Sequence, residues 1–360
     1  MSIPRFALVL GGGGLKGFAH IGVLRALEER GLTPSVICGT SIGSLIGAAR
    51  AGGMSVDEMS EHAVALTQAD LFRVDHMGMV VRRMRNPSLY LETPLRKLVA
   101  SVTPDVTFDA LPVQLLVSTV DIEHGSQLVW GLPGLRDVSV RDAVYASCAL
   151  PGFFPPARIR DHLCVDGSVM DNLPTDPVVN DVDAIIAVDV GGTSIAISRK
   201  MQRGGFAAVY MRSAQIMMHA LQHEKLRRWT LPPMLLVRPA TWNYPWFTFA
   251  RTPQIIAAGY EAACEMLDAC GLPSGAGVHP RRRVEITVDE NACVGCGICA
   301  TLAPAAMRMN AAHKAEPVAS PVEWSRADGD FVHHCPTDAI HVTVVEGGRR
   351  RPSFQVEAME

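Results

Sequence analysis

The sequence has no apolar run long enough to span a bilayer. A transmembrane helix needs about 20 consecutive apolar residues, and the longest apolar stretch, residues 36–49, is interrupted by Gly39, Ser41 and Gly43. The apolar run at residues 6–10 is shorter than the core of a secretory signal and leads directly into a glycine turn. The sequence therefore predicts a soluble or peripheral protein that lacks an export signal.

The sequence also lacks an excess of either charge. Its 33 basic and 36 acidic side chains give a formal net charge of −3, so we expect no basic face that binds nucleic acid. The arginine clusters at residues 281–283 and 349–351 are most simply solvated linker and tail segments, with contact to anionic lipid as the alternative.

Aromatic residues are scarce, at 6% of the chain, but several gather in one place. An aromatic segment at residues 242–249 contains Trp242, Tyr244, Trp246, Phe247 and Phe249. Such clusters usually pack against a core, whereas Trp and Tyr also favour the headgroup level of a membrane. Peripheral docking at the inner face of a membrane is therefore the alternative interpretation of this segment.

The cysteines do not form the even, regular pattern of a disulfide framework. They number nine and are irregularly spaced, which favours metal ligation by some of them and predicts a reducing, cytoplasmic environment. Five cysteines in apolar surroundings are expected to be buried packing residues. These five are Cys38, Cys148, Cys164, Cys264 and Cys270.

What the sequence does contain is an alternation of short β-branched runs and amphipathic helical stretches. A chain of 360 residues is long enough for one large domain and a smaller one. Strands buried on both faces with helices between them predict an α/β fold, a layered sheet with flanking helices. The expected strands of the larger domain are residues 6–10, 35–38, 113–120, 163–165, 184–190 and 235–237.

Composition marks the boundary between the two domains. The last helix of the larger domain stops before Gly271, and residues 272–283 are rich in glycine and proline, as in a linker. We therefore predict a larger domain at residues 1–271, a small α+β domain at residues 284–346 and a polar tail at residues 347–360.

A glycine loop at residues 11–17 joins the first strand to a helix. Gly12, Gly14 and Gly17 satisfy the dinucleotide pattern GxGxxG, but such a site needs an acidic residue at the end of the second strand, where residues 38–41 read CGTS. A Walker phosphate loop is excluded because glycine, rather than Ser or Thr, follows the lysine of the loop. Neither nucleotide site is therefore expected.

The end of the second strand instead carries GTSIG, residues 39–43, which matches the GxSxG nucleophile elbow. In such an elbow a strand turns sharply into a helix and leaves the serine hydroxyl exposed near the positive helix end, so Ser41 is the candidate nucleophile. The N–H groups of Gly12, Gly13 and Gly14 are then expected to form an oxyanion hole, where each donor contributes on the order of 3 kcal/mol.

The order and spacing of these pieces resemble the patatin-like phospholipases over about residues 6–271. The motifs that carry the resemblance are GGGLKG at residues 12–17, GTSIG at 39–43, ASCALPGFFPP at 146–156, VDGS at 165–168 and DNLP at 171–174. The resemblance implies a lipid acyl hydrolase with a Ser–Asp dyad, in which Asp166 takes the proton of Ser41 directly. The family's usual DGG or DGA is DGS here, a departure that bears on the geometry of the site.

Other titratable side chains are weaker candidates for catalysis. Asp189, at the end of another apolar strand, is the rival carboxylate. His20 is expected to be a packing residue, and Lys16 either steadies the glycine loop or is solvated. In a Ser–Asp–His hydrolase, His219 or His223 would be the base, but both lie in a helical pattern.

A CxxCxxC motif lies in the C-terminal part of the chain. Cys293, Cys296 and Cys299 form it, and Cys335 stands directly before a proline. This pattern is typical of iron–sulfur ligation, with zinc as the rival. Residues 284–345 resemble the bacterial-type ferredoxins.

A ferredoxin with two clusters needs four further cysteines, and this chain has none of them. Their positions hold Ala303, Ser325, Asp328 and Phe331. The sequence therefore predicts a single 4Fe-4S cluster, held by the four cysteines of the CxxCxxC motif and the CP pair.

The motifs leave three functions open. The first is a lipid acyl hydrolase that acts on a phospholipid or another acyl ester, with the cluster domain providing redox control or a docking site for a redox protein. The second is an electron-transfer or redox-sensing protein whose larger domain binds lipid. The third is an acyltransferase, in which the acyl group passes to an acceptor other than water.

Overall fold

The computed structural model contains two compact units. It describes residues 5–74, 88–179, 182–191, 205–230, 232–241, 244–270, 282–324, 331–335, 337, 339–346 and 349–350. The larger unit takes in Met1–Val178 and Ala184–Ser274, and the smaller one is built mainly from the residues that follow Gly275. Each unit has a hydrophobic core of its own.

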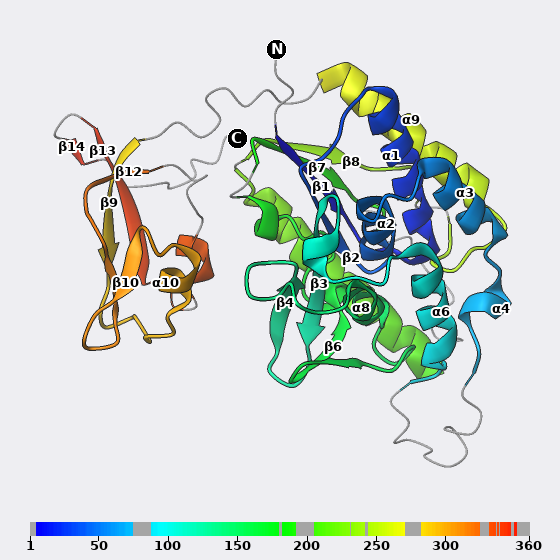
Figure 1. Cartoon of the computed structure of the whole chain (residues 1–360), viewed down its shortest axis with the longest axis horizontal. Coiled ribbons are helices and arrows are strands. Elements are labelled where there is room, and N and C mark those ends of the chain that lie inside the picture. The colour runs from blue at the N-terminus through cyan, green and yellow to red at the C-terminus, as the bar shows by residue number, and fades with distance from the viewer. Residues whose placement is uncertain are drawn as a thin grey trace. The chain divides into compact units, whose positions relative to one another are not determined.

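A mixed sheet of eight strands forms the centre of the larger unit (Figure 1). The strands are β1 (Phe6–Leu10), β2 (Val36–Thr40), β3 (Gln114–Asp121), β4 (Ser126–Trp130), β5 (Ala157–Ile159), β6 (His162–Asp166), β7 (Ala184–Val188) and β8 (Met234–Val237). Their order is β5-β6-β3-β2-β1-β7-β8, with β4 paired to β3. From β3 to β8 the strands run parallel, whereas β4, β5 and β6 are antiparallel to their neighbours.

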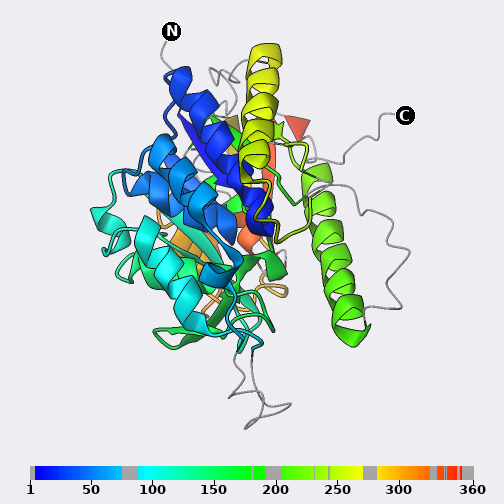
Figure 2. The same cartoon turned by 90° about the vertical axis from the view of Figure 1, so that its right-hand side faces the viewer.

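Helices of very different length surround this sheet. They are α1 (Ala19–Glu29), α2 (Ile42–Ala51), α3 (Val56–Ala65), α4 (Gln68–Leu71), α6 (Glu92–Val102), α7 (Val140–Cys148), α8 (Gly205–Arg227) and α9 (Thr252–Cys270). The helices α1 and α9 pack along each other, and α2 lies against β2 and β3 and also contacts α7. The long α8 runs along one side of the unit (Figure 2).

The central strands are apolar because both of their faces are covered. Every residue of β1, β2 and β7 is buried, as expected for parallel strands between helices. The predicted α/β fold is confirmed. Two strands of this sheet were not expected from the sequence: β4 begins with exposed and half-buried residues, and β5 has only three residues, so neither shows a continuous apolar run.

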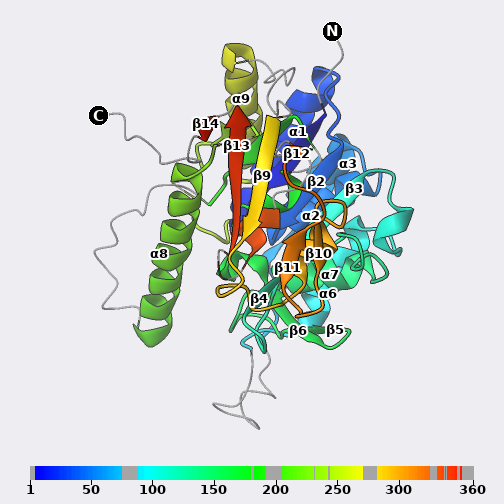
Figure 3. The same ribbon diagram turned by 90° about the vertical axis from the view of Figure 1, so that its left-hand side faces the viewer.

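The smaller unit is built on antiparallel strands, of which β9 and β13 lie side by side (Figure 3). Its elements are β9 (Arg282–Val288), α10 (Ile298–Leu302), β10 (Met307–Met309), β11 (Ala315–Pro317), β12 (Val322–Trp324), a 3₁₀ helix (Phe331–His334), β13 (Ile340–Glu346) and β14 (Arg349–Arg350). One sheet has the order β12-β9-β13-β14, and β10 pairs with β11.

Two arginine clusters take part in these strands. β9 begins at Arg282, two residues before the expected start, and Arg283 stands opposite Glu323 of β12. Cross-strand pairs of opposite charge stabilise a sheet, which explains why the strand extends into the segment read as linker. Likewise, Arg350 of β14 stands opposite Val345, within the segment read as a tail. Residues 271–281 lie outside the described residues.

No helix in the described part of the chain is both long and apolar enough to cross a bilayer.

Candidate functional site

Ser41 lies in the sharp turn between β2 and α2. Its dihedral angles are φ 54° and ψ −129°, and a positive φ in a residue with a side chain is a strained conformation that clusters at functional sites. Close backbone contacts explain the flanking glycines. A Cβ atom at Gly39 would lie 2.5 Å from the Gly43 carbonyl oxygen, and one at Gly43 would lie 2.1 Å from the Leu10 carbonyl oxygen. The GTSIG sequence thus folds as a strand–turn–helix elbow.

Two hydrogen bonds hold this elbow in place. The Ser41 N–H donates to the Ser147 hydroxyl oxygen at 2.9 Å, and the Ser147 hydroxyl donates to the Ser118 carbonyl at 2.7 Å. Ser147 lies in α7, within the ASCALPGFFPP motif, and is fully buried. The sequence singled out the motif but gave Ser147 no role, because its two partners are 106 and 29 residues away along the chain.

The strand β3 brings Ser41 and Asp166 to the same place. Residues 114–118 of β3 pair with β2, and residues 119–121 pair with β6. The strand β4 pairs with residues 117–121 along one edge of β3. The strands β2 and β6 therefore share the other edge of β3, where they meet end to end. Ser41 follows the last residue of β2, and Asp166 is the last residue of β6. The two predicted dyad residues therefore meet at one junction of the sheet.

The Asp166 carboxyl group is buried, with only 1% of the residue exposed. One of its oxygens accepts the Ser168 N–H at 2.9 Å. Burial raises the pKa of Asp166 to about 6, and hydrogen bonds from the Ser168 N–H and from the Ser41 and Ser168 side chains oppose this rise. A carboxyl group with a pKa in this range can both accept and return a proton near neutral pH.

The N–H groups of the glycine loop differ in their hydrogen bonding. The Gly12 N–H donates to the Asn172 carbonyl at 3.0 Å and is therefore already engaged. Among the described residues, the N–H groups of Gly13 and Gly14 have no hydrogen-bond partner. The loop lies beside the nucleophile, since a Cβ atom at Gly12 would be 3.2 Å from the Ser41 Cβ. The oxyanion role of the three glycines stays a prediction, and within it the N–H groups of Gly13 and Gly14 are the ones that are not already engaged.

The DNLP motif ties the glycine loop to α8. The Asn172 side-chain amide donates to the Gly12 carbonyl and to Gln222 Oε1, both at 3.2 Å. Its neighbour Asp171 accepts a hydrogen bond from Lys225 Nζ at 2.7 Å. Gln222 and Lys225 both belong to α8. This helix therefore positions the DNLP segment, and the DNLP segment in turn holds Gly12.

An apolar cavity of about 90 Å³ opens beside Ser41. Side chains of α2, α3 and α6 form much of its wall, together with aromatic rings. Representative lining residues are Ile42, Leu45, Leu95, Leu98, Phe154 and Phe247. A pocket that is almost entirely apolar, with a serine hydroxyl at its edge, suits a hydrocarbon chain better than a polar ligand.

The aromatic segment packs inward at this cavity. The ring centroids of Phe247 and Phe72 are 4.9 Å apart in an edge-to-face arrangement, and the Leu15 N–H donates to the Trp246 carbonyl at 2.7 Å. Its described aromatic members are half-buried, and Trp242 lies outside the described residues. Phe247 therefore forms part of the cavity wall, and Tyr244, Phe247 and Phe249 pack against the core of the larger unit, in line with the packing interpretation.

The rival carboxylate Asp189 lies on the other side of the glycine loop. It follows β7, which pairs with β1 rather than with β2 or β3, and its Oδ1 accepts the Gly191 N–H at 3.1 Å. The charge of Asp189 acts on the buried Lys16, whose pKa is lowered by burial and raised in part by this carboxylate. Lys16 is thus a buried residue of the loop rather than a solvated one.

None of the candidate histidines lines the cavity beside Ser41. His20 is buried, and its Nε2–H donates to the Gly11 carbonyl at 2.8 Å. Burial lowers the pKa of His20 to about 4, so the ring is neutral near pH 7 and acts as a support for the loop. The rings of His219 and His223 lie 6.2 Å apart on α8.

The four cysteines predicted as ligands line one small cavity of the smaller unit. Cys293 and Cys299 are buried, Cys335 is half-buried and Cys296 is exposed. The two glycines of the CVGCGIC segment adopt φ values of 71° and 74°, which let the backbone turn tightly around a ligand. The structure therefore brings all four residues to one place.

Backbone N–H groups point at two of the sulfur atoms. The Ala339 N–H donates to Cys335 Sγ at 3.3 Å, and the Ala315 N–H donates to Cys293 Sγ at 3.5 Å. Hydrogen bonds of this kind stabilise the negative charge of thiolates that ligate iron and tune the potential of a cluster. The donor set fits an iron–sulfur group.

The spacing of the cysteines also bears on zinc as the rival metal. Within the described residues, Cys293, Cys296 and Cys299 do not form a group whose sulfur atoms all lie within 4.8 Å of one another. Thiolates bound to a single zinc ion, each about 2.3 Å from it, lie within about 4 Å of one another.

Two of the positions where a second cluster would need cysteines hold side chains of the core of the smaller unit. Ala303 and Phe331 are buried there, with 6% and 1% of the residue exposed. The corresponding positions 325 and 328 lie outside the described residues.

Comparison with known families agrees with this division of the chain. Residues 8–179 match the family model for patatin-like phospholipase, and residues 286–342 match the model for a 4Fe-4S single cluster domain.

Curated relatives share the N-terminal part of the chain. An uncharacterized NTE family protein of Mycobacterium tuberculosis is 33% identical over 199 residues, which cover 55% of this chain and 52% of that protein. The human patatin-like phospholipase domain-containing protein 6 is 33% identical over 189 residues, covering 51% of this chain and 13% of that protein. The chain therefore matches about half the length of the mycobacterial relative.

Among solved structures, VipD from Legionella pneumophila has 16% identity and a TM-score of 0.42, and the match covers 74% of this chain and 67% of that one.

Proposed function

We propose that this chain, whose residues 8–179 match the model for patatin-like phospholipase and whose residues 286–342 match the model for a 4Fe-4S single cluster domain, is a lipid acyl hydrolase with a fused iron–sulfur module. The observation that carries the proposal is the meeting of Ser41, a buried Asp166 and the Gly13 and Gly14 N–H groups beside an apolar cavity. The cavity would hold the acyl chain of a phospholipid or another acyl ester.

The proposed reaction proceeds through an acyl-enzyme. The Ser41 hydroxyl attacks the ester carbonyl while its proton passes to the Asp166 carboxylate, and the Gly13 and Gly14 N–H groups stabilise the oxyanion that forms. When the C–O bond of the leaving alcohol breaks, Asp166 returns the proton to that oxygen. A water molecule then attacks the acyl-enzyme, Asp166 accepts its proton and returns it to Ser41, and the carboxylic acid is released.

The direct test is substitution of the two dyad residues. Ser41→Ala and Asp166→Asn should each lower kcat for a short-chain aryl ester by at least about 10³-fold, because the first removes the nucleophile and the second removes the base. Ser101→Ala, an exposed serine of α6 whose hydroxyl donates only to the Leu98 carbonyl of the same helix, is the matched control and should keep most of the activity. Full hydrolysis by either dyad variant, with the protein folded as judged by circular dichroism, would show that the assignment is wrong.

Acyl transfer is a second outcome of the same chemistry. It needs an acceptor alcohol in place of water at the deacylation step. Product analysis by mass spectrometry with and without added glycerol or lysolipid separates the two reactions. Release of free fatty acid alone supports hydrolysis.

The smaller unit is proposed to hold one 4Fe-4S cluster on Cys293, Cys296, Cys299 and Cys335. When bound, the cluster supplies one-electron chemistry, and we assign it to redox control of the hydrolase or to docking of a redox protein. Hydrolysis assayed with the cluster oxidised, reduced and removed distinguishes these roles. A rate that follows the redox state supports control, and an unchanged rate supports docking.

An electron-transfer protein without hydrolytic activity remains the alternative. The comparison of ester hydrolysis by the wild type and by Ser41→Ala tests this alternative.

A peripheral contact with the inner face of an anionic membrane is proposed through α8. Its exposed apolar side chains are Val209, Ile216, Met217 and Leu221, each at least 45% exposed. Residues 205–228 contain four basic side chains and one acidic one; Lys225 points inward to Asp171, and Glu224 pairs with Arg227 and Arg228. Apolar side chains beside an excess of positive charge favour an anionic lipid surface as the partner.

The position of α8 relative to the catalytic residues supports this assignment. The 3₁₀ helix η4 (Gly167–Val169) follows Asp166 directly and contacts α8. Val169 and Met170 add further exposed apolar surface there, at 40% and 43% exposure. A lipid bound at this surface would therefore lie beside the strand end that carries the proposed base.

A further inference from the structure

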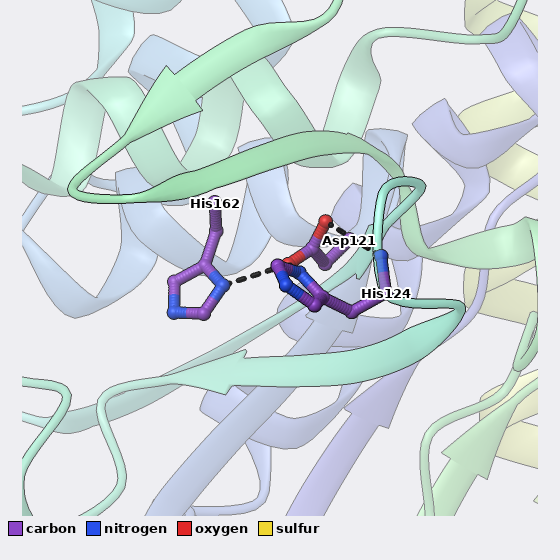
Figure 4. A group of neighbouring side chains, drawn as sticks. All are labelled: Asp121, His124 and His162. Carbon is purple, nitrogen blue, oxygen red and sulfur yellow. Dashed lines mark hydrogen bonds and ion pairs between the residues drawn. The ribbon is translucent and has the colours of Figure 1, made fainter.

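Asp121, His124 and His162 form a compact group outside the cavity that contains Ser41 (Figure 4). The Nδ1 atoms of His124 and His162 each lie 2.7 Å from the same Asp121 oxygen, Oδ2. The three atoms that can bind a metal all lie within 4.8 Å of one another. The Asp121 side chain is fully buried, whereas His124 and His162 are 66% and 34% exposed, so the group is open to solvent on the histidine side.

The second oxygen of Asp121 fixes the carboxylate. Oδ1 accepts the backbone N–H groups of Glu123 at 2.9 Å and of His124 at 3.4 Å. Because the turn between β3 and β4 occupies Oδ1, Oδ2 is left to face the two imidazole rings. A carboxylate oriented by backbone donors in this way is prepared to act as a metal ligand.

We propose that Asp121, His124 and His162 bind a divalent transition-metal ion of the Zn²⁺ type. Two imidazole nitrogens and one carboxylate oxygen are a ligand set that Zn²⁺ accepts with three protein ligands, and water fills the fourth position. Both imidazoles keep one proton by carrying it on Nε2 when Nδ1 binds the ion. Ligand atoms about 2.1 Å from a tetrahedral ion are about 3.4 Å apart, so the present hydrogen-bonded contacts need to lengthen by about 0.7 Å.

The metal would join two parts of the sheet that lie far apart in sequence. Asp121 is the last residue of β3, His124 lies in the turn to β4, and His162 is the first residue of β6. The strand β6 carries Asp166 at its other end. An ion at this place holds the β3–β4 turn against the start of β6, and so stabilises the strand of the proposed base without entering the cavity.

The test is titration of the full chain, with its cluster reconstituted, using Zn²⁺ alone. Isothermal titration calorimetry of the wild type should give one saturable Zn²⁺ site per chain. His124→Gln and His162→Gln each remove one ligand nitrogen and should weaken binding by about 100-fold. His341→Gln, an exposed histidine of the smaller unit, is the matched control and should bind like the wild type.

Zinc-edge X-ray absorption identifies the ligands independently of affinity. The expected first shell contains only nitrogen and oxygen at about 2.0–2.1 Å, without the sulfur scattering at about 2.3 Å that cysteine ligands give. Wild-type protein without a saturable site, binding that both histidine variants retain, or a first shell that contains sulfur would each overturn the proposal. Zn²⁺ should also raise the midpoint of thermal unfolding in the wild type and in His341→Gln, but not in His124→Gln.

Discussion

Single residues set the acid–base chemistry of the proposed site. Asp166 is buried beside Ser41, and its ionised form is stabilised by only a few hydrogen bonds, two of which come from Ser168. Ser168 is the residue by which DGS departs from the DGG or DGA of the family. Its hydroxyl therefore lowers the pKa of a base that burial would otherwise raise further.

Activity on a soluble aryl ester is expected to decrease below about pH 6. Asp166 must be ionised to accept the Ser41 proton, and its pKa of about 6 lies above the ordinary value of 3.8. As the pH falls through this pKa, the base becomes protonated and kcat/KM should decrease by about tenfold per pH unit. The measurement is a profile of kcat/KM between roughly pH 4.5 and 8.

Two variants assign the inflection of that profile. Ser168→Ala removes a hydrogen bond to the ionised carboxylate, so its inflection should move to higher pH. His62→Gln is the control, because His62 is an ionisable side chain that lines the cavity; the inflection of this variant should stay in place. A profile that is flat down to pH 4.5, or one that moves with His62, contradicts Asp166 as the base.

Among the elements, α8 has two different surfaces, one that holds the DNLP motif and one that is proposed to contact lipid. Gln222 and Lys225 hold the DNLP motif and through it the glycine loop. The exposed face presents Met217 and Leu221, which are 59% and 55% exposed. A helix that supports the oxyanion loop and also contacts lipid would place the site at the membrane surface.

Substitution on the exposed face of α8 should weaken binding to anionic vesicles. The double variant Met217→Glu, Leu221→Glu removes apolar area and adds negative charge, so its partition coefficient should fall by roughly tenfold or more. Sedimentation with vesicles of phosphatidylcholine, alone or mixed with phosphatidylglycerol, measures this. Aryl ester hydrolysis should persist.

The matched control for this experiment is Val64→Glu on α3, because Val64 is 55% exposed. It should bind vesicles like the wild type. Higher salt should weaken the wild-type interaction, since the attraction of basic residues to anionic lipid is screened. Equal binding by both glutamate variants, or self-association through α8 in place of vesicle binding, would rule out this surface as the lipid contact.

At the scale of the whole molecule, the chain has two cores built from separate residues. The core of the smaller unit contains Cys293 and Cys299 themselves, among few other side chains. A unit of this size has little apolar surface to bury, so a bound cluster contributes a large part of its stability. The larger unit has an extensive core without these cysteines.

Loss of the cluster is therefore expected to unfold the smaller unit alone. Cys299→Ala should lose the visible absorption of the cluster, and calorimetry should show the transition of the smaller unit at a lower temperature. The transition of the larger unit and its aryl ester hydrolysis should persist. Cys264→Ala, a change in α9 of the larger unit, should retain about four irons per chain. A single transition that moves as a whole in Cys299→Ala would contradict independent units.

Much of the fold and of the candidate site could be predicted from the sequence because the signals are local. The strands β1, β2 and β7 contain short apolar runs and lie where they were predicted, although β2 extends to Thr40 and β7 ends at Val188. The GTSIG and CxxCxxC patterns fix which side chains share a turn. In contrast, β4 and β5 are short or half-exposed, and their pairing depends on partners elsewhere in the chain.

The sequence by itself determined the identity of Ser41, Asp166 and the four cysteines as candidates, because motif spacing and residue chemistry are properties of the chain. Only the tertiary structure decided that Asn172 engages the Gly12 N–H, and that Asp121 and His162 face one another across 41 residues. Hydrogen bonds between segments depend on strand order and register. These are decided by the packing of the whole sheet, which no local pattern contains.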